Sequence, residues 1–384
     1  MRTRLTSAFR GVSIAAAAVV FASCSTETPE PFRGVDLALG APEYLSEMNL
    51  MEWDGEKISY APGVERYDLN TWLFSDYSLK DRAIYMPKGT AATYRENEVF
   101  DFPVGTVILK SFMFPADFRS PTEDIDLIET RVLVRFEDEW KAFPYVWDHE
   151  LGDAVLRVQG DVQVVEFIDE AGVMKTSNYL VPQKNQCSEC HLLKDLATEE
   201  DYMTPVGPKA RHLNRVSGFN GDGVNQLEHL RDAGLLLDMP PMAEVGAAYD
   251  FTQVLANGVD SLDPETIETA ARDYLDINCA HCHNPEGVSG ISSQLFLNYD
   301  NTDQFHLGVC KKPGSAGKGG EGRTYDIVPG DPEASILIYR TETEELGAMM
   351  PLIGRSLPHT QGMEVLRAWI AAMPPDDCET EPSP

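Results

Sequence analysis

Residues 263–283 read DPETIETAARDYLDINCAHCH and place a helix start, an apolar stripe and a cysteine motif in one stretch. Asp263-Pro264-Glu265 is typical of a helix N-terminus, because aspartate caps free backbone N–H groups and proline fits the first turn. The apolar residues that follow recur at helical spacing: Ile267, Ala270, Ala271, Tyr274 and Leu275. The stretch therefore predicts a helix that leads directly into Cys279-Ala280-His281-Cys282-His283.

The same cysteine motif occurs again as Cys187-Ser188-Glu189-Cys190-His191. C-x-x-C-H is the attachment pattern of c-type haem, in which two thiols bond the vinyl groups of one porphyrin and the adjacent histidine reaches the iron. A thioredoxin-like redox pair or a zinc knuckle would compete for a single copy. Two copies favour two covalently bound haem c groups, with His191 and His283 as the proximal iron ligands.

The ligand on the other side of each iron separates an electron carrier from a catalyst. For the second motif, Ala348-Met349-Met350-Pro351 precedes an apolar stripe at residues 359–373 that predicts a C-terminal helix packed on the first one. We expect Met350 to be the distal ligand, with Met349 as its competitor.

The first motif has less decisive candidates for a distal ligand, and an open iron is the alternative. The residues within reach are Met203, His212, His229, Met239 and Met242.

Two further expectations concern the second motif: the Pro285 carbonyl accepts the ring N–H of His283, and His281 is solvated.

The N-terminus has the features of an export signal. Arg2, Arg4 and Arg10 precede an apolar run at residues 12–22 that is too short to span a bilayer, so residues 1–23 are expected to be a signal peptide. Phe21-Ala22-Ser23-Cys24 resembles a bacterial lipobox, which predicts lipidation of Cys24; an ordinary signal peptide with an incidental cysteine is the alternative. Residues 24–39 then form a tether, and Ser25 favours a periplasm-facing position at the outer membrane.

The region between residues 40 and 182 is strand-like. Residues 107–114 alternate between two faces, and turn residues such as Gly160-Asp161 separate further short runs. We therefore predict an α+β protein. Its parts are an antiparallel β-rich domain at residues 40–182, a first haem segment at 183–258, a class I-like cytochrome c domain at 259–378 and a tail at 379–384.

Charge and the remaining cysteines add two expectations. The chain of 384 residues carries 31 Lys plus Arg against 62 Asp plus Glu, a formal net charge of -31. This balance excludes a nucleic-acid partner, because affinity for a phosphate backbone depends on basic residues. Cys310 and Cys378 form an even pair in an oxidising compartment, so a disulfide between them is expected.

Several short motifs together resemble a family of bacterial diheme c-type cytochromes. The motifs are Tyr67-Asp68-Leu69-Asn70, Leu73-Phe74-Ser75-Asp76-Tyr77, Phe102-Pro103-Val104-Gly105-Thr106, Glu129-Thr130-Arg131, Gln186-Cys187, Gly207-Pro208-Lys209-Ala210-Arg211 and Asn278-Cys279-Ala280-His281-Cys282-His283. The resemblance implies two covalent haems, electron transfer with periplasmic or membrane redox proteins, attachment to the membrane through lipid only, and a parallel β-helix protein as a neighbour.

Three hypotheses follow. In the first, the chain is an electron carrier. In the second it is a diheme enzyme, peroxidase-like or P460-like, with an open first haem. Residues 102–106 are similar to the β-rich cytochrome P460 group, in which a lysine modifies a catalytic haem. Lys110 would be that lysine. In the third, the β-rich domain docks a partner protein.

Overall fold

The N-terminal half of the chain forms an antiparallel sheet, as its alternating pattern predicts. The computed structural model describes residues 30–219, 221 and 223–378, so the signal peptide, Cys24 and the tail at 379–384 lie outside the described residues. A six-stranded sheet has the order β3-β4-β6-β7-β8-β9, with every neighbouring pair antiparallel. The strands are β3 (Val64–Arg66), β4 (Leu79–Tyr85), β6 (Val107–Pro115), β7 (Ile125–Arg135), β8 (Trp140–Asp148) and β9 (Asp153–Leu156).

This sheet is buried on both faces, as β6 illustrates. Val107 and Leu109 pack with residues of the N-terminal segment, including Met51. Ile108 and Phe112, which point to the opposite face, belong to two other apolar clusters. One of these clusters also contains Ile277 from the helical region, so the sheet directly supports the second cysteine motif.

Short strand pairs surround the sheet. They are β1 (Met51–Trp53) with β2 (Ile58–Tyr60), β10 (Asp161–Ile168) with β11 (Met174–Val181), β12 (Leu192–Lys194) with β13 (Asp201–Met203), and β5 (Ala92–Thr93) in parallel with β14 (Leu236–Leu237). The first cysteine motif follows β11 directly, without a long preceding helix. The β12–β13 hairpin follows that motif in turn.

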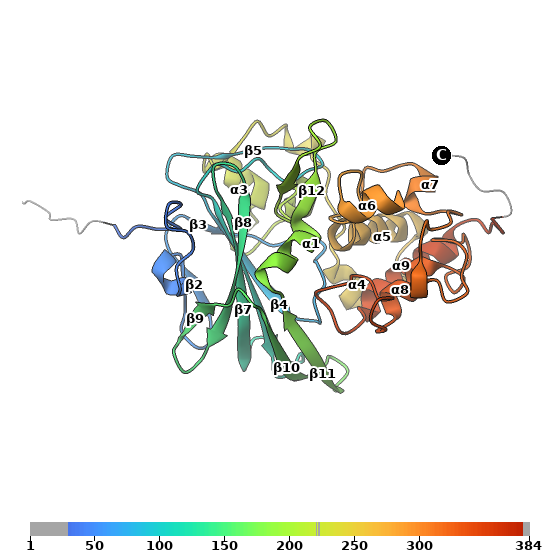
Figure 1. Ribbon diagram of the computed structural model, residues 1–384, viewed down its shortest axis with the longest axis horizontal. Coiled ribbons are helices and arrows are strands. Elements are labelled where there is room, and N and C mark those ends of the chain that lie inside the picture. The colour runs from blue at the N-terminus through green and yellow to red at the C-terminus, as the bar shows by residue number, and fades with distance from the viewer. Residues whose placement is uncertain (1–29, 220, 222, 379–384) are drawn as a thin grey trace, which may run out of the picture. The chain divides into compact units, whose positions relative to one another are not determined.

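The longer helices are concentrated in the C-terminal part, which confirms the α+β class (Figure 1). The helices are α1 (Ser188–His191), α2 (Ala210–Leu213), α3 (Gln226–Asp232), α4 (Thr252–Asn257), α5 (Pro264–Asn278), α6 (Val288–Ser293), α7 (Gln304–Leu307), α8 (Ile336–Glu342) and α9 (Thr360–Ala372). Among the described residues, no helix has the length and apolar character needed to cross a membrane.

Helix α5 begins as its sequence predicts, since the Asp263 carboxylate accepts the Thr266 N–H at 2.9 Å. Helix α9 packs closely on α5: a Cβ atom added to Gly362 would lie 2.5 Å from the ring of Tyr274. Asp331-Pro332-Glu333 repeats the pattern of Asp263-Pro264-Glu265 and would predict a second helix start, but this prediction is wrong. Asp331 does not begin α8, because its carboxylate accepts the Ala334 N–H in a turn that precedes the helix.

Candidate functional site

The second cysteine motif is wound into a tight turn at the end of α5. Cys279 caps the helix, and its carbonyl accepts the N–H of His283 at 2.9 Å. The chain then folds back so closely that a Cβ atom at Gly287 would lie 2.2 Å from the Cys282 carbonyl oxygen, and one at Gly290 only 1.8 Å from that of Asn284. Glycine is therefore required at both positions to keep the motif in this shape.

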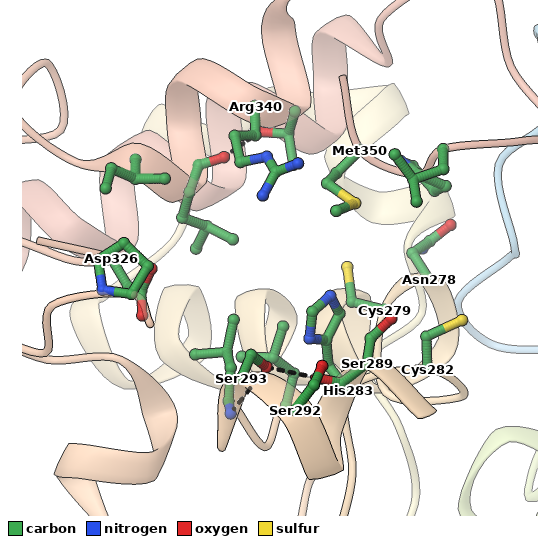
Figure 2. Close-up of a pocket in the computed structure, with 18 of the residues that line it drawn as sticks. Asn278, Cys279, Cys282, His283, Ser289, Ser292, Ser293, Asp326, Arg340 and Met350 are labelled. Carbon is green, nitrogen blue, oxygen red and sulfur yellow. Dashed lines mark hydrogen bonds between the residues drawn. The ribbon is translucent and has the colours of Figure 1, made fainter. Parts of the chain in front are cut away.

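A cavity of about 420 Å³ opens beside this motif (Figure 2). Cys279, Cys282, His283 and Met350 line it, together with apolar side chains that include Leu297. Figure 2 shows the Met350 sulfur and the His283 ring on opposite sides of the space, facing one another.

Met350 and Met349 differ in position. Met349 is buried at 7% exposure and is not among the residues that line the cavity, whereas Met350 is. Two arginines hold the segment: the Arg355 Nε donates to the Met350 carbonyl at 2.9 Å, and the Arg340 carbonyl accepts the Met350 N–H at 2.7 Å. Of the two candidate ligands, the structure brings only Met350 to His283.

Burial lowers the pKa of His283 to about 4, so its ring is neutral near pH 7 and able to bind a metal. Its Nδ1 is buried and has no hydrogen-bond partner among the described residues. The predicted bond to the Pro285 carbonyl is therefore wrong. Pro285 is exposed and lines a different cleft from His283, so its carbonyl does not serve this ring.

These features fit a covalently attached haem. The cavity has the volume of an ordinary ligand site, and its walls are mainly apolar. Two thiols, a neutral imidazole and a thioether sulfur are the groups that hold haem c. Arg340 also lines the cavity, with its Nε bonded to the Ala348 carbonyl at 2.9 Å, and it supplies a positive charge suited to a carboxylate.

The first motif presents a similar set of donors. His191 Nδ1 donates to the Thr204 carbonyl at 2.7 Å, which fixes the tautomer and leaves Nε2 available for a metal. Burial lowers the pKa of His191 to about 4. Cys187, Cys190 and His191 line a cavity of about 110 Å³, below the usual range for a ligand site. The donors fit haem attachment, whereas the volume requires the lining side chains to move apart.

None of the five predicted distal candidates lines the cavity beside His191. The residues in question are Met203, His212, His229, Met239 and Met242. His212 is bonded to Asp276 at 2.9 Å and His229 to Glu65 at 2.8 Å, so both imidazoles have other partners. The three methionines pack against the apolar cluster on one face of the sheet. Spacing along the chain was a poor guide here, because the fold gives the two histidines other partners and packs the three methionines against the apolar cluster.

The sheet instead presents basic side chains to this first cavity. Lys110 on β6 lies directly opposite Arg82 on β4 and Arg131 on β7, and Lys110 and Arg131 both line the cavity. Arg82 pairs with Asp68 at 3.0 Å and Arg131 with Glu129 at 2.5 Å.

Lys110 differs from these neighbours. Its side chain makes no hydrogen bond or ion pair with any described residue, and its Nζ lies 5.1 Å from the ring centroid of Phe112. Burial lowers the pKa of Lys110 well below its ordinary value. An amine in this position is a candidate reactive group.

The two motifs meet, although their second cysteines, Cys190 and Cys282, lie 92 positions apart along the sequence. One donor atom each from Cys190, His281 and Cys282 lies within 4.8 Å of the others. The prediction that His281 is solvated is therefore wrong: its Nδ1 is buried, and the residue lines both cavities. Without haem attachment, two thiols and an imidazole this close would also suit a metal ion such as zinc.

Two polar residues that sequence reasoning did not single out hold the sheet region against the C-terminal helical region. Asn278 accepts the Phe74 N–H at 2.7 Å and donates to the Trp72 carbonyl at 3.1 Å. Asp76 accepts hydrogen bonds from the backbone of Ser356 and Leu357. Their place inside the motifs quoted above could have identified them in the sequence, since Asn278 directly precedes Cys279.

The expected disulfide between Cys310 and Cys378 is present. Neither sulfur belongs to the cysteine motifs, so four thiols remain at those motifs. His149, which is half-exposed, bonds to Asp126 at 2.8 Å and belongs to none of the metal-ligand clusters of the described residues.

Comparison with known proteins gives no relative: no family model, curated protein or solved structure matches this chain.

Proposed function

We propose that this chain is a diheme c-type cytochrome that carries electrons between redox partners in the periplasm, with Cys24 as its lipid anchor. The observation that carries the proposal is the placement of two C-x-x-C-H motifs at adjoining cavities. Cys190, Asn278 and His281 line both cavities. Two attached haems would thus lie close enough to act together.

The side chains around the second cavity have separate roles in this proposal. Bound haem supplies one-electron chemistry at iron. His283, neutral at pH 7, and Met350, which faces it across the cavity, would hold the iron. Apolar residues such as Leu295 and Ile336 keep water away from the site. A haem held by both residues would suit electron transfer with little rearrangement.

Mass spectrometry of the intact mature protein, coexpressed with haem-maturation machinery, tests the proposal. Two covalent haems are expected, and replacing Cys279 and Cys282 together by alanine is expected to remove one of them. Electron paramagnetic resonance (EPR) of the oxidised protein then reports the ligands of each iron. A mass without haem, accompanied by bound zinc, would overturn the proposal.

A second candidate function is a diheme enzyme whose first haem is open. The observation that favours it is the wall of the first cavity, where Lys110 stands in place of the expected methionine or histidine. In this hypothesis His191 is proximal, the opposite side admits peroxide or another small substrate, and the second haem supplies electrons. A high-spin EPR signal from the first haem would support it.

Lys110→Met separates the two functions, with Lys141→Met as the matched control because Lys141 lies on β8 with 39% of its side chain exposed. In the enzyme, only Lys110→Met changes the spectrum of the first haem and the rate of peroxide turnover with an artificial donor. If Lys110 is bonded to haem, peptide mass mapping finds both on one fragment. Identical turnover in both variants would contradict a catalytic role for Lys110.

A further inference from the structure

The contact between the two cysteine motifs involves backbone as well as side chains. The Cys282 thiol, which carries its proton here, donates to the Glu189 carbonyl at 3.1 Å and so lies against the first motif. Thioether formation removes that proton, and after haem attachment the contact rests on the segments that flank the motifs. The sulfurs of Cys190 and Cys282 and a ring nitrogen of His281 lie within 4.8 Å of one another. Each motif thus turns its second cysteine toward the other motif.

Flanking segments fix this contact. Leu193 on β12 forms an isolated bridge with Gly287, and the Lys194 N–H donates to the Glu286 carbonyl at 2.9 Å. The Tyr202 hydroxyl on β13 donates to the Glu286 carboxylate at 2.7 Å. Because the hairpin after the first motif is bonded to the loop after the second, the approach of the thiols does not depend on side-chain rotamers alone.

We propose that Cys190 and Cys282 hold the attached edges of two haems in direct contact, with the His281 imidazole beside them, so that the pair exchanges electrons within one molecule. This rests on the proposed function, since it requires a haem at each motif. A thioether bond ties a porphyrin edge to its sulfur. Two sulfurs this close therefore bring the two edges together.

The exchange itself is a one-electron step. One iron is oxidised from ferrous to ferric, and the other is reduced from ferric to ferrous by the same electron. No heavy-atom bond forms or breaks, and no further oxidant or reductant takes part. His281 contributes position only, since it lines both cavities.

A metal ion bound by the same three side chains is the competing occupant. Thiolates and imidazole are good zinc ligands, whereas a sulfur already bonded to haem is a weak one. Haem attachment and zinc binding at Cys190 and Cys282 therefore exclude each other, which makes the two occupants separable by mass and metal analysis.

The test compares the full mature protein with two single-haem variants: Cys187→Ala with Cys190→Ala, and Cys279→Ala with Cys282→Ala. Intact mass first counts the haems of each sample. EPR of the oxidised proteins and a potentiometric titration follow. We expect the two-haem protein to show broadened EPR lines and shifted midpoint potentials, compared with the summed spectra and titration curves of the two single-haem variants. A spectrum and titration equal to that sum would overturn the contact.

Flash reduction of the wild-type protein gives a second test that does not depend on the folding of any variant. We expect electrons to equilibrate between the haems at a rate independent of protein concentration. A rate that rises in proportion to concentration would mean exchange between molecules and would overturn the proposal. Failure of the proposed function is recognised earlier, because the mass then shows fewer than two haems.

His281→Ala tests the part assigned to the imidazole, with His149→Ala as the control because His149 is half-exposed and bonded to Asp126. We expect slower intramolecular equilibration in His281→Ala only, with both haems retained. An unchanged rate would remove His281 from the contact.

Discussion

Replacing Asp76 should show how the sheet region holds the Met350 segment. Asp76 is 2% exposed, and its carboxylate accepts four hydrogen bonds. One oxygen takes the N–H groups of Ser356 and Leu357 at 2.6 and 2.8 Å. The other takes the hydroxyls of Ser177 and Ser356 at 2.9 and 3.0 Å.

The expected loss differs between alanine and asparagine. Asp76→Ala leaves two backbone N–H groups without an acceptor, and each such group costs about 1–3 kcal/mol. Alanine also tolerates the left-handed backbone of this residue, φ 48°, less well than aspartate, which adds about 1 kcal/mol. The free energy of unfolding should therefore fall by about 3–7 kcal/mol in Asp76→Ala.

Asparagine keeps one acceptor for the two N–H groups, and its amide can donate to the two serine hydroxyls. It also tolerates a positive φ, so Asp76→Asn loses mainly the strengthening that the charge gives to the hydrogen bonds, about 1–2 kcal/mol. Urea unfolding of the haem-loaded protein, followed by circular dichroism, measures both variants. Asp260→Asn, at an exposed aspartate, is the control.

Two outcomes would refute this reasoning. If Asp76→Ala unfolds within about 0.5 kcal/mol of the wild type, a range usual for surface changes, the carboxylate does not hold the segment. If Asp76→Asn is as unstable as Asp76→Ala, the negative charge rather than the acceptor geometry is essential. The charge-transfer band expected from the proposed Met350–iron bond gives a further readout, since Asp76→Ala should weaken it.

Three further predictions use other contacts. Met350→Ala should open the second iron to cyanide and carbon monoxide, whereas Met349→Leu should leave the binding of both ligands unchanged. If the two variants bind these ligands equally, Met350 is not an iron ligand. Gly362→Ala should lower the free energy of unfolding by about 1–3 kcal/mol, because the added methyl group overlaps the Tyr274 ring, and a neutral result in urea unfolding would contradict this. Burial lowers the pKa of His359 to about 3. The free energy of unfolding should therefore fall as the pH drops from about 6.5 toward 3, by up to about 1.4 kcal/mol per pH unit. His359→Phe should flatten this pH dependence.

The controls for these predictions isolate one contact each. Gly218→Ala is the match for Gly362→Ala, because an added Cβ at Gly218 meets nothing within 4 Å. The sign for His359 follows from proton binding: above pH 6.5 neither state binds the extra proton, and below it only the unfolded state does until about pH 3. Equal slopes of stability against pH in the wild type and His359→Phe would contradict the assignment.

Local patterns predicted local structure well. The Asp263 cap, the apolar stripe and the end of α5 at Asn278 all lie within one stretch of chain, and each was readable from nearest neighbours. The alternation at residues 107–114 likewise predicted β6, because period-two patterns follow from the pleat of a strand. In both cases the deciding interactions are between residues close in sequence.

Long-range packing decided what the sequence left open. His281 was predicted to be solvated, yet the docking of the β12–β13 hairpin brings Cys190 against it. The distal candidates of the first motif failed for the same reason: His212 is fully buried beside Asp276 of α5, a partner 64 residues away. Spacing alone does not show which distant segment a side chain will meet.

The sheet region is also part of the candidate haem sites, and this bears on whether it acts as a separate docking module. Lys110 and Arg131 form a wall of the first cavity, and the Phe74 segment is bonded to Asn278 beside the second motif. Deleting residues 40–180 would remove these groups and expose Ile277, which is 1% exposed in the sheet-facing cluster. Loss of partner binding after such a deletion would not distinguish docking from damage to the cavities. A docking surface has to be sought by single substitutions at exposed positions of the sheet region, with both haems counted in every variant.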